Sequence, residues 1–228
     1  MRKFTFLLIV FCLSCSMSFG QFYEMKPHFI SIGGGICRNN FEETKNIGYS
    51  GTVEGAYFFH YLFGAGLKVD YSYFTPLANK FADNYKTKPD IKYNRTTTDV
   101  TNYIVRNYTA NAYFNAMPNE WFSLMISAGA GFQFLSTPSG SILYEEVYPY
   151  NNYGTPIPNQ NAFVEVKKES YHPVVFHAGI KTNFMFSEFF GMNVFGDYFY
   201  SKNTAFLNER NHQFSGGIGL VFMFPEIY

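Results

Sequence analysis

Apolar and polar residues alternate along eight stretches of the sequence with a period of two, which is the pattern of β-strands. The clearest stretch is 63–73, where Phe, Ala, Leu, Val and Tyr at odd positions alternate with Gly, Lys, Asp and Ser at even ones. Residues 122–134 repeat this pattern. Six further stretches follow it less strictly, at about 28–37, 48–59, 102–115, 172–186, 190–201 and 213–224. The sequence therefore predicts an all-β protein of eight strands.

The links between these stretches alternate in length. Long polar links occur at about 38–47, 74–101, 135–171 and 202–212, and short ones at 60–62, 116–120 and 187–189. Outer-membrane barrels have short periplasmic turns and longer extracellular loops in this order. We therefore predict an eight-stranded antiparallel up-and-down transmembrane β-barrel. With its N-terminus in the periplasm, every long link is expected outside the cell.

A soluble β-barrel such as a lipocalin would show the same alternation but would bury its apolar face. The polar faces of the predicted strands are dominated by Ser, Gly, Asn and Thr, whereas a water-facing sheet normally carries more Lys and Glu. Small residues fit the crowded interior of eight strands, which has room only for side chains. We therefore expect the polar faces to line the lumen and the apolar faces to contact lipid.

Aromatic residues gather at both ends of the predicted strands. Those flanking the short turns are Tyr57, Phe59, Tyr113, Trp121, Phe122, Phe184, Phe186 and Phe190. Those toward the long links are Tyr71, Tyr73, Tyr103, Phe134, Tyr198 and Tyr200. Two such belts are typical of the two interfaces of a bilayer, so we predict that these rings face lipid.

The N-terminus has the pattern of a signal peptide. Positive residues precede the apolar run 4–13, and Ser18 and Gly20 supply the small side chains that a cleavage site requires. The run is too short to cross a bilayer as a helix, which needs about 20 residues. We predict that 1–20 are removed and that 21–228 form one barrel domain; an uncut membrane anchor is the alternative.

A lipoprotein is a second alternative, because Cys15 follows an apolar stretch. A lipobox requires a branched apolar residue three positions earlier, and Cys12 stands there instead. Cleavage after residue 20 would remove both of these cysteines. Cys37 would then remain alone, so no internal disulfide is expected, and we interpret Cys37 as a buried small hydrophobic residue.

Composition supports a membrane protein. Aromatic residues make up 21% of the chain and charged residues 15%, against about 25% charged in a typical soluble domain. Loss of Arg2 and Lys3 with the signal peptide would take the net charge from 0 to −2. A nucleic-acid-binding protein would show a basic excess, so we expect no nucleic-acid partner.

The last predicted strand resembles the β-signal that delivers outer-membrane proteins to their assembly machinery. A polar residue and glycines are followed by apolar residues at alternate positions and a closing aromatic residue. The key positions are Gly217, Leu220, Phe222 and Phe224. The chain departs from the pattern by continuing four residues further.

With these features, the mature chain resembles the small outer-membrane β-barrel superfamily, to which the OmpA transmembrane domain, OmpX and OmpW belong. Its richness in Tyr, Asn and Phe resembles the "outer membrane protein β-barrel domain" or porin-family proteins of Bacteroidetes. The resemblance implies an integral protein of the outer membrane, in contact with lipid and lipopolysaccharide, that is inserted by the assembly machinery.

Six charged or titratable residues are expected to face the lumen. They are Glu54, Lys68, Asp70, His177, Lys181 and Asp197. Isolated charges in a poorly hydrated space are costly, so these residues should pair. We expect a salt-bridged plug, as in the OmpA-like barrels that the sequence resembles; the alternative is that they line a conduction path.

The third long link is the candidate interaction loop. It contains Tyr144, Tyr148, Tyr150 and Tyr153, interspersed with three prolines. Tyrosines beside prolines offer rigid contact area at small entropic cost, which suits a protein partner at the cell surface. Packing of the tyrosines on one another or on lipopolysaccharide is an equally good interpretation.

Catalytic and metal-binding patterns are weak. The glycine clusters lack the Lys-Ser/Thr of a phosphate-binding loop. His172 and His212 could approach Ser215 and Glu169 at the outer rim, or form a metal site with Glu145 or Glu146, but their spacing enforces neither arrangement.

We therefore predict a protein that is not an enzyme and has no cofactor. It would act as a structural component or as a loop-mediated interaction partner in a surface complex. Two alternatives stay open: a narrow pore for ions or small solutes, and a lipid-modifying enzyme of the lipid A deacylase or acyltransferase type.

Overall fold

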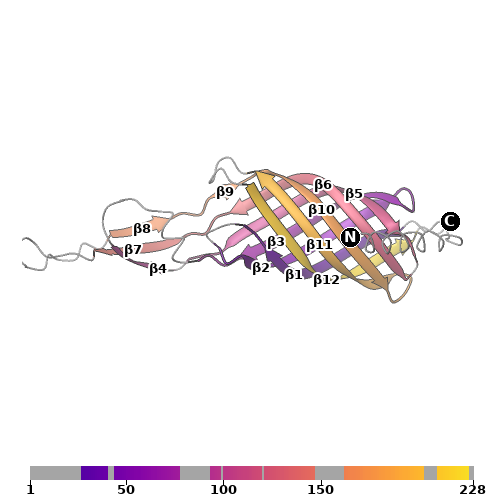
Figure 1. Cartoon of the computed structure of the whole chain (residues 1–228), viewed down its shortest axis with the longest axis horizontal. Coiled ribbons are helices and arrows are strands. Elements are labelled where there is room, and N and C mark those ends of the chain that lie inside the picture. Colours follow the sequence, from indigo (N-terminus) through magenta and orange to yellow (C-terminus); the bar gives the residue numbers. More distant parts are fainter. Residues whose placement is uncertain are drawn as a thin grey trace, which may run out of the picture.

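The computed structural model describes residues 27–40, 44–77, 93–98, 100–119, 121–146, 162–202 and 210–225. Eight strands form one antiparallel barrel (Figure 1): β1 (Pro27–Arg38), β2 (Ile47–Phe58), β3 (Phe63–Phe74), β5 (Tyr103–Met117), β6 (Phe122–Ser136), β10 (Val174–Met185), β11 (Phe190–Lys202) and β12 (Arg210–Pro225). Each pairs with its neighbours along the chain, and the pairing of β1 with β12 closes the ring. The predicted eight-stranded up-and-down barrel is confirmed. In the described part of the chain, no helix is long and apolar enough to cross a membrane.

The long connections contain strands that the sequence did not predict. β4 (Tyr93–Thr98), β7 (Gly140–Glu146) and β8 (Ala162–Val166) form a separate three-stranded antiparallel sheet in the order β4-β7-β8. The short β9 (Ser170–Tyr171) pairs with the end of β6. Figure 1 shows the three-stranded sheet projecting beyond one end of the barrel. Its β4 reads Tyr-Asn-Arg-Thr-Thr-Thr and lacks apolar alternation, so only its pairing with a distant connection reveals it as a strand.

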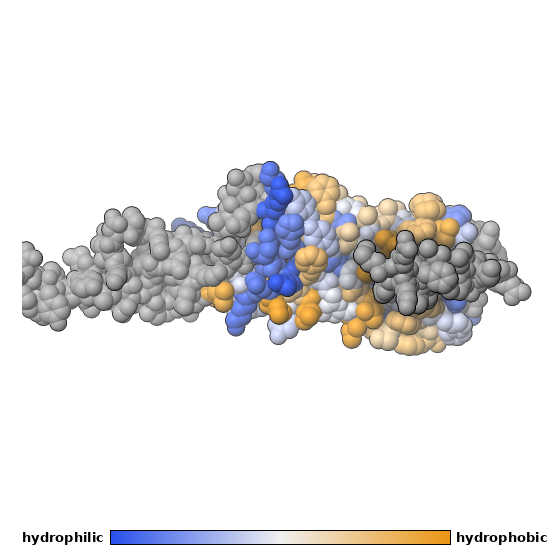
Figure 2. Space-filling model, in the orientation of Figure 1, coloured by the Kyte–Doolittle hydropathy of each residue, from blue (hydrophilic) through white to orange (hydrophobic). Residues whose placement is uncertain are grey.

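The barrel has an apolar outside and a polar inside. Outward-facing Leu67 and Ile218 are 69% and 61% exposed, whereas inward-facing Asn107 and Gln213 are fully buried. Figure 2 shows hydrophobic atoms over the barrel wall and a hydrophilic band at the end next to the long connections. Such an apolar wall is stable in hydrocarbon and not in water. The soluble-barrel alternative, which buries the apolar face, is wrong.

Most of the predicted aromatic belts face outward, with two exceptions. Tyr57 and Trp121 are exposed near the short turns, and Tyr71 is exposed toward the long connections. Tyr103 and Tyr113 instead face the lumen and are buried, so their assignment to the belts was wrong. Both occupy odd positions of β5, the same face as the buried residues between them. Their aromatic character suggests lipid, but their odd positions within the complete strand place both rings inside.

These tyrosines belong to two apolar clusters, one at each end of the lumen. The turn-end cap, beside the short turns, consists of Phe29, Ala56, Phe58, Tyr113, Met125, Met185 and Val221. The loop-end cap, beside the long connections, consists of Cys37, Phe74, Tyr103, Val105 and Leu135. Cys37 is a free, buried thiol, as expected. The two apolar caps therefore lie on either side of the polar middle of the lumen, and a few buried polar side chains lie beside them.

The closing strand β12 carries the predicted assembly signal. A Cβ atom at Gly217 would lie 2.1 Å from the carbonyl oxygen of Gly34 on β1, so only glycine fits where the two strands meet. The other three signal residues are exposed on the outer face: Leu220, Phe222 and Phe224. Their role in assembly stays a prediction.

Candidate functional site

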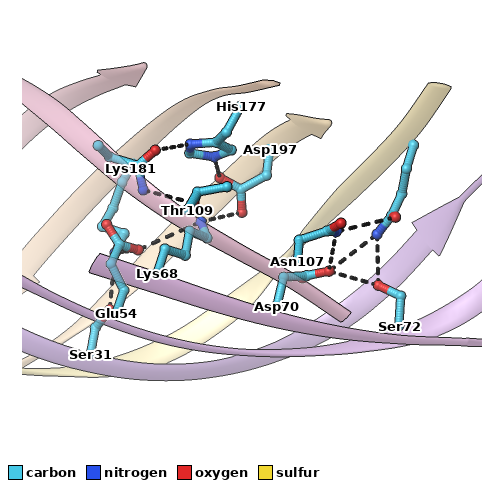
Figure 3. Close-up of polar contacts among 12 residues, drawn as sticks. Ser31, Glu54, Lys68, Asp70, Ser72, Asn107, Thr109, His177, Lys181 and Asp197 are labelled. Carbon is cyan, nitrogen blue, oxygen red and sulfur yellow. Dashed lines mark hydrogen bonds and ion pairs between the residues drawn. The ribbon is translucent and has the colours of Figure 1, made fainter. Parts of the chain in front are cut away.

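Five of the six predicted lumen residues meet in the middle of the barrel (Figure 3), and we call them the ion cluster: Glu54, Lys68, His177, Lys181 and Asp197. Lys68 Nζ lies 2.6 Å from Asp197 Oδ2 and 3.5 Å from Glu54 Oε2. Lys181 Nζ lies 2.5 Å from the same Glu54 oxygen. His177 Nε2 lies 2.9 Å from Asp197 Oδ1. The cluster links four strands across the lumen.

Strand register explains how these side chains reach one another. Glu54 on β2 and Lys68 on β3 are direct cross-strand partners. On the other side of the lumen, Asp197 of β11 is paired with Gly179 of β10. A Cβ atom at Gly179 would lie 2.6 Å from Asp197 Oδ1, so the missing side chain leaves Asp197 room to contact His177. Sequence reasoning assigned Gly179 no role.

Lys181 and His177 also have hydrogen-bond partners outside the ion cluster. Lys181 Nζ donates to Ser31 Oγ at 2.9 Å, and His177 Nδ1 lies 2.8 Å from Asn111 Oδ1. Lys181 Nζ also stands 4.8 Å above the Phe29 ring, a cation–π distance that joins the ion cluster to the turn-end cap. Two carboxylates face two ammonium groups, so the buried charges are locally compensated, which burial requires.

Asp70 lies outside the ion cluster, and the expected pairing with another charged side chain is not seen for it among the described residues. Its Oδ1 accepts hydrogen bonds from Ser72 Oγ at 2.9 Å, Gln213 Nε2 at 3.1 Å and Asn107 Nδ2 at 3.3 Å. No described residue forms an ion pair with Asp70, and its Oδ2 has no hydrogen-bond partner. The Lys68 side chain extends instead to Glu54 and Asp197 (Figure 3).

Amide side chains continue this second polar layer, which we call the amide cluster: Asp70, Ser72, Asn107, Gln133, Ser201, Asn211 and Gln213. Gln133 is its hub. Its Nε2 donates to Asn107 Oδ1 at 2.8 Å, and its Oε1 accepts from Ser201 Oγ at 2.8 Å and Asn211 Nδ2 at 3.2 Å. Sequence analysis missed these amides. Asn107, Gln133 and Gln213 lie at inward-facing positions of the predicted strands, a signal that could have found them, whereas Asn211 lies before the predicted strand 213–224.

The described side chains therefore form four layers along the lumen. Along β3, Lys68 lies in the ion cluster, Asp70 and Ser72 in the amide cluster, and Phe74 in the loop-end cap. The turn-end cap closes the opposite end. A hydrated ion passing through would have to separate charge pairs, break the amide contacts and displace both caps.

The residues of the candidate catalytic site do not converge. His212 and Ser215 are three positions apart on β12 and lie on opposite faces, with Ser215 buried in the lumen. His212 Nδ1 is 2.7 Å from the Tyr198 hydroxyl, His172 packs edge-on against Phe134, and Glu169 accepts a hydrogen bond from Tyr171. The approach of Ser215 to the rim histidines, which the sequence left open, is therefore not seen. No group of three metal-binding side chains occurs in the described part of the chain.

The candidate interaction loop is described only in part. Tyr144 lies on β7, where its backbone is paired with Arg95 of β4 and Ala162 of β8. Tyr148, Tyr150 and Tyr153 lie outside the described residues, as do the predicted signal peptide and its cleavage site.

No protein-family model matches the sequence, and no curated protein matches it. The solved structures with a similar fold include Ail, the attachment invasion locus protein of Yersinia pestis, with 16% identity over 88% of this chain and 100% of that one, at a TM-score of 0.46. Neisserial surface protein A has 9% identity over 86% of this chain and 97% of that one, at a TM-score of 0.47. The N-terminal β-barrel domain of Pseudomonas aeruginosa OprF has 11% identity over 88% of this chain and 100% of that one, at a TM-score of 0.42.

At these identities the likeness concerns the fold alone. The chain itself forms a closed, eight-stranded antiparallel β-barrel with an apolar outer wall. The resemblance to Bacteroidetes proteins stays a prediction.

Proposed function

We propose that this chain is a non-enzymatic outer-membrane barrel that anchors an interaction surface at the outside of the cell. The short turns and both barrel termini would face the periplasm, since Pro27 and Pro225 are paired at the short-turn end. The long connections would then stand outside, where they act as a structural or binding element of a surface complex.

The observation that carries this proposal is the contrast between the two ends of the barrel. At one end the strands are joined by turns of a few residues; at the other, two connections distant in sequence pair with each other as β4, β7 and β8. Ordering long connections costs conformational entropy of about 1–2 kcal/mol per residue. Their pairing provides a defined platform for a partner, and binding sites commonly lie on such connections above a rigid scaffold.

The filled lumen supports an anchor over a pore. Two ion pairs join strands on opposite sides of the lumen: Lys181 with Glu54 at 2.5 Å and Lys68 with Asp197 at 2.6 Å. Apolar side chains lie at both ends of the lumen. The outward His212 and the inward Ser215 give no support to a lipid-modifying enzyme.

The experiment uses two deletions in intact cells. One lacks residues 147–161, which include Tyr148, Tyr150 and Tyr153, and keeps the three described strands. The other lacks 140–166, and with it β7 and β8. Both should insert normally, as judged by different migration of boiled and unboiled samples on a denaturing gel. Both should lose the partner that chemical cross-linking attaches to the native protein.

The control is the double variant His172→Ala/His212→Ala, which should keep the cross-linked partner. Unchanged cross-linking after both deletions, with altered lipid A acylation in the histidine variant, would contradict the proposal and favour the enzyme.

A further inference from the structure

A cavity of about 750 Å³ opens at the loop end of the barrel, where β12 begins, β1 ends and β2 begins. We call it the rim cavity. The lining residues that matter here are Arg38, Asn40, Lys45, Asn46, His212 and Phe214. Its size lies within the range of about 300–1,000 Å³ that small-molecule sites occupy.

The walls of the rim cavity are fixed by hydrogen bonds on two sides. Asn40 binds the end of β1 to β12: its Nδ2 donates to the Arg210 carbonyl, and its Oδ1 accepts from the His212 backbone, both at 2.8 Å. On the other side, the Lys45 backbone N–H donates to the Thr75 carbonyl at 2.9 Å. A cavity held in this way needs little ordering when a ligand binds.

Among the described residues that line the rim cavity, the charged side chains are positive. Arg38 and Lys45 are exposed, and neither forms an ion pair with a described residue. Among the described residues, no carboxylate lines the cavity. Arginine and lysine in one cavity suit a phosphate group, to which guanidinium donates in a bidentate manner. The asparagine amides and His212 Nε2 add hydrogen-bonding groups that suit sugar hydroxyls.

The rim cavity also borders the lipid-facing wall. Arg38 is an outward residue of β1, and its cross-strand partners are Ile47 and Phe214, which are 66% and 55% exposed. Figure 2 shows hydrophilic and hydrophobic atoms side by side at this end of the barrel. A ligand whose phosphate reaches Arg38 can therefore place acyl chains along the apolar wall.

We propose that the rim cavity binds the phosphorylated sugar headgroup of a glycolipid in the adjacent leaflet. Arg38 and Lys45 pair with the phosphate, while the amide side chains and His212 contact the sugar. This inference does not depend on whether the projecting sheet binds a partner.

The test measures binding of purified protein to lipid A, a phosphorylated glucosamine disaccharide lipid, in phosphatidylcholine nanodiscs. The double variant Arg38→Gln/Lys45→Gln should lower affinity for lipid A about tenfold or more, because two charged hydrogen-bonding contacts are lost. The matched control Lys167→Gln/Lys168→Gln changes the charge equally on exposed residues that do not line the cavity, and should lower affinity by about twofold or less. Arg38→Lys keeps the charge and loses the bidentate contact, so it should lower affinity by less than the double glutamine variant does.

Three outcomes would overturn the proposal. The first is an equal loss of lipid A affinity in the two glutamine double variants, which would indicate a general attraction between positive charge on the protein and the lipid. The second is equal affinity for lipid A and its dephosphorylated form. The third is competition by soluble glucosamine phosphate at the same concentration as lipid A, which would make a free sugar phosphate the ligand. Gel migration before and after boiling checks that every variant is folded.

Discussion

The ion cluster and the amide cluster are adjacent layers of one lumen, yet they bury their carboxylates differently. Glu54 and Asp197 each have a lysine ammonium within 2.6 Å. Asp70, on the same strand face as Lys68, is surrounded by neutral donors from Ser72, Asn107 and Gln213. Removing one partner of a buried ion pair leaves an uncompensated charge, at a cost of about 3–5 kcal/mol. A lost neutral hydrogen bond costs about 1–3 kcal/mol. Substitutions in the ion cluster should therefore lower the free energy of unfolding more than substitutions in the amide cluster do.

The largest effect is expected from Lys68→Met, which keeps the length of the side chain and removes its charge. Asp197 and Glu54 would then share Lys181 and His177, and the free energy of unfolding should fall by about 3–5 kcal/mol. Unfolding in urea can be followed by the fluorescence of Trp121, the only tryptophan, which is exposed beside a short turn.

A second substitution sharpens this prediction. Lys68→Met/Asp197→Asn restores the balance of charge and should recover part of the lost stability, a non-additivity that a double-mutant cycle measures. Strict additivity would show that the two side chains are not coupled.

An intermediate effect is expected in the amide cluster from Gln133→Leu. The substitution removes the donor to Asn107 and the acceptor for Ser201 and Asn211, leaving buried polar groups without partners. We expect a loss of about 1–3 kcal/mol in the same urea assay. If Gln133→Leu lowered the free energy of unfolding as much as Lys68→Met does, the proposed difference between the two clusters would be contradicted.

The smallest effect is expected from Asp70→Asn. An amide oxygen can still accept from Ser72 and Gln213, and the neutral side chain no longer brings an unpaired charge into the lumen. The free energy of unfolding should change by less than about 1 kcal/mol, in either direction. Asp197→Asn is the matched control, since the same chemical change there removes the partner of Lys68 and should cost several times more. Equal losses at the two positions would contradict this account.

Periodicity predicted the barrel strands well because each has one face in lipid and one in the lumen. Leu67 and Lys68 are neighbours in sequence and differ in exposure from 69% to 2%, and this contrast makes the period of two visible. The sheet of β4, β7 and β8 lacks that contrast. Its strands are defined by pairing between connections, for which local sequence carries little information.

The sequence predicted which charged side chains of the candidate site face the lumen, but it did not predict which of them contact one another. Their even positions in β3 place Lys68 and Asp70 on one face of the strand. They do not show that the Lys68 side chain extends across the lumen to Asp197 on β11. The caps were missed for a related reason. Phe74 and Tyr103 have the apolar character of lipid-facing residues, and only their parity within the complete strands places them inside.

The most direct test of the central claim, a lumen closed throughout its length, is the conductance of the purified native protein in planar lipid bilayers. The ion cluster, the amide cluster and the two caps predict no steady single-channel current over a range of voltages. Large, reproducible conductance steps from the unmodified protein would contradict a closed lumen and establish the pore.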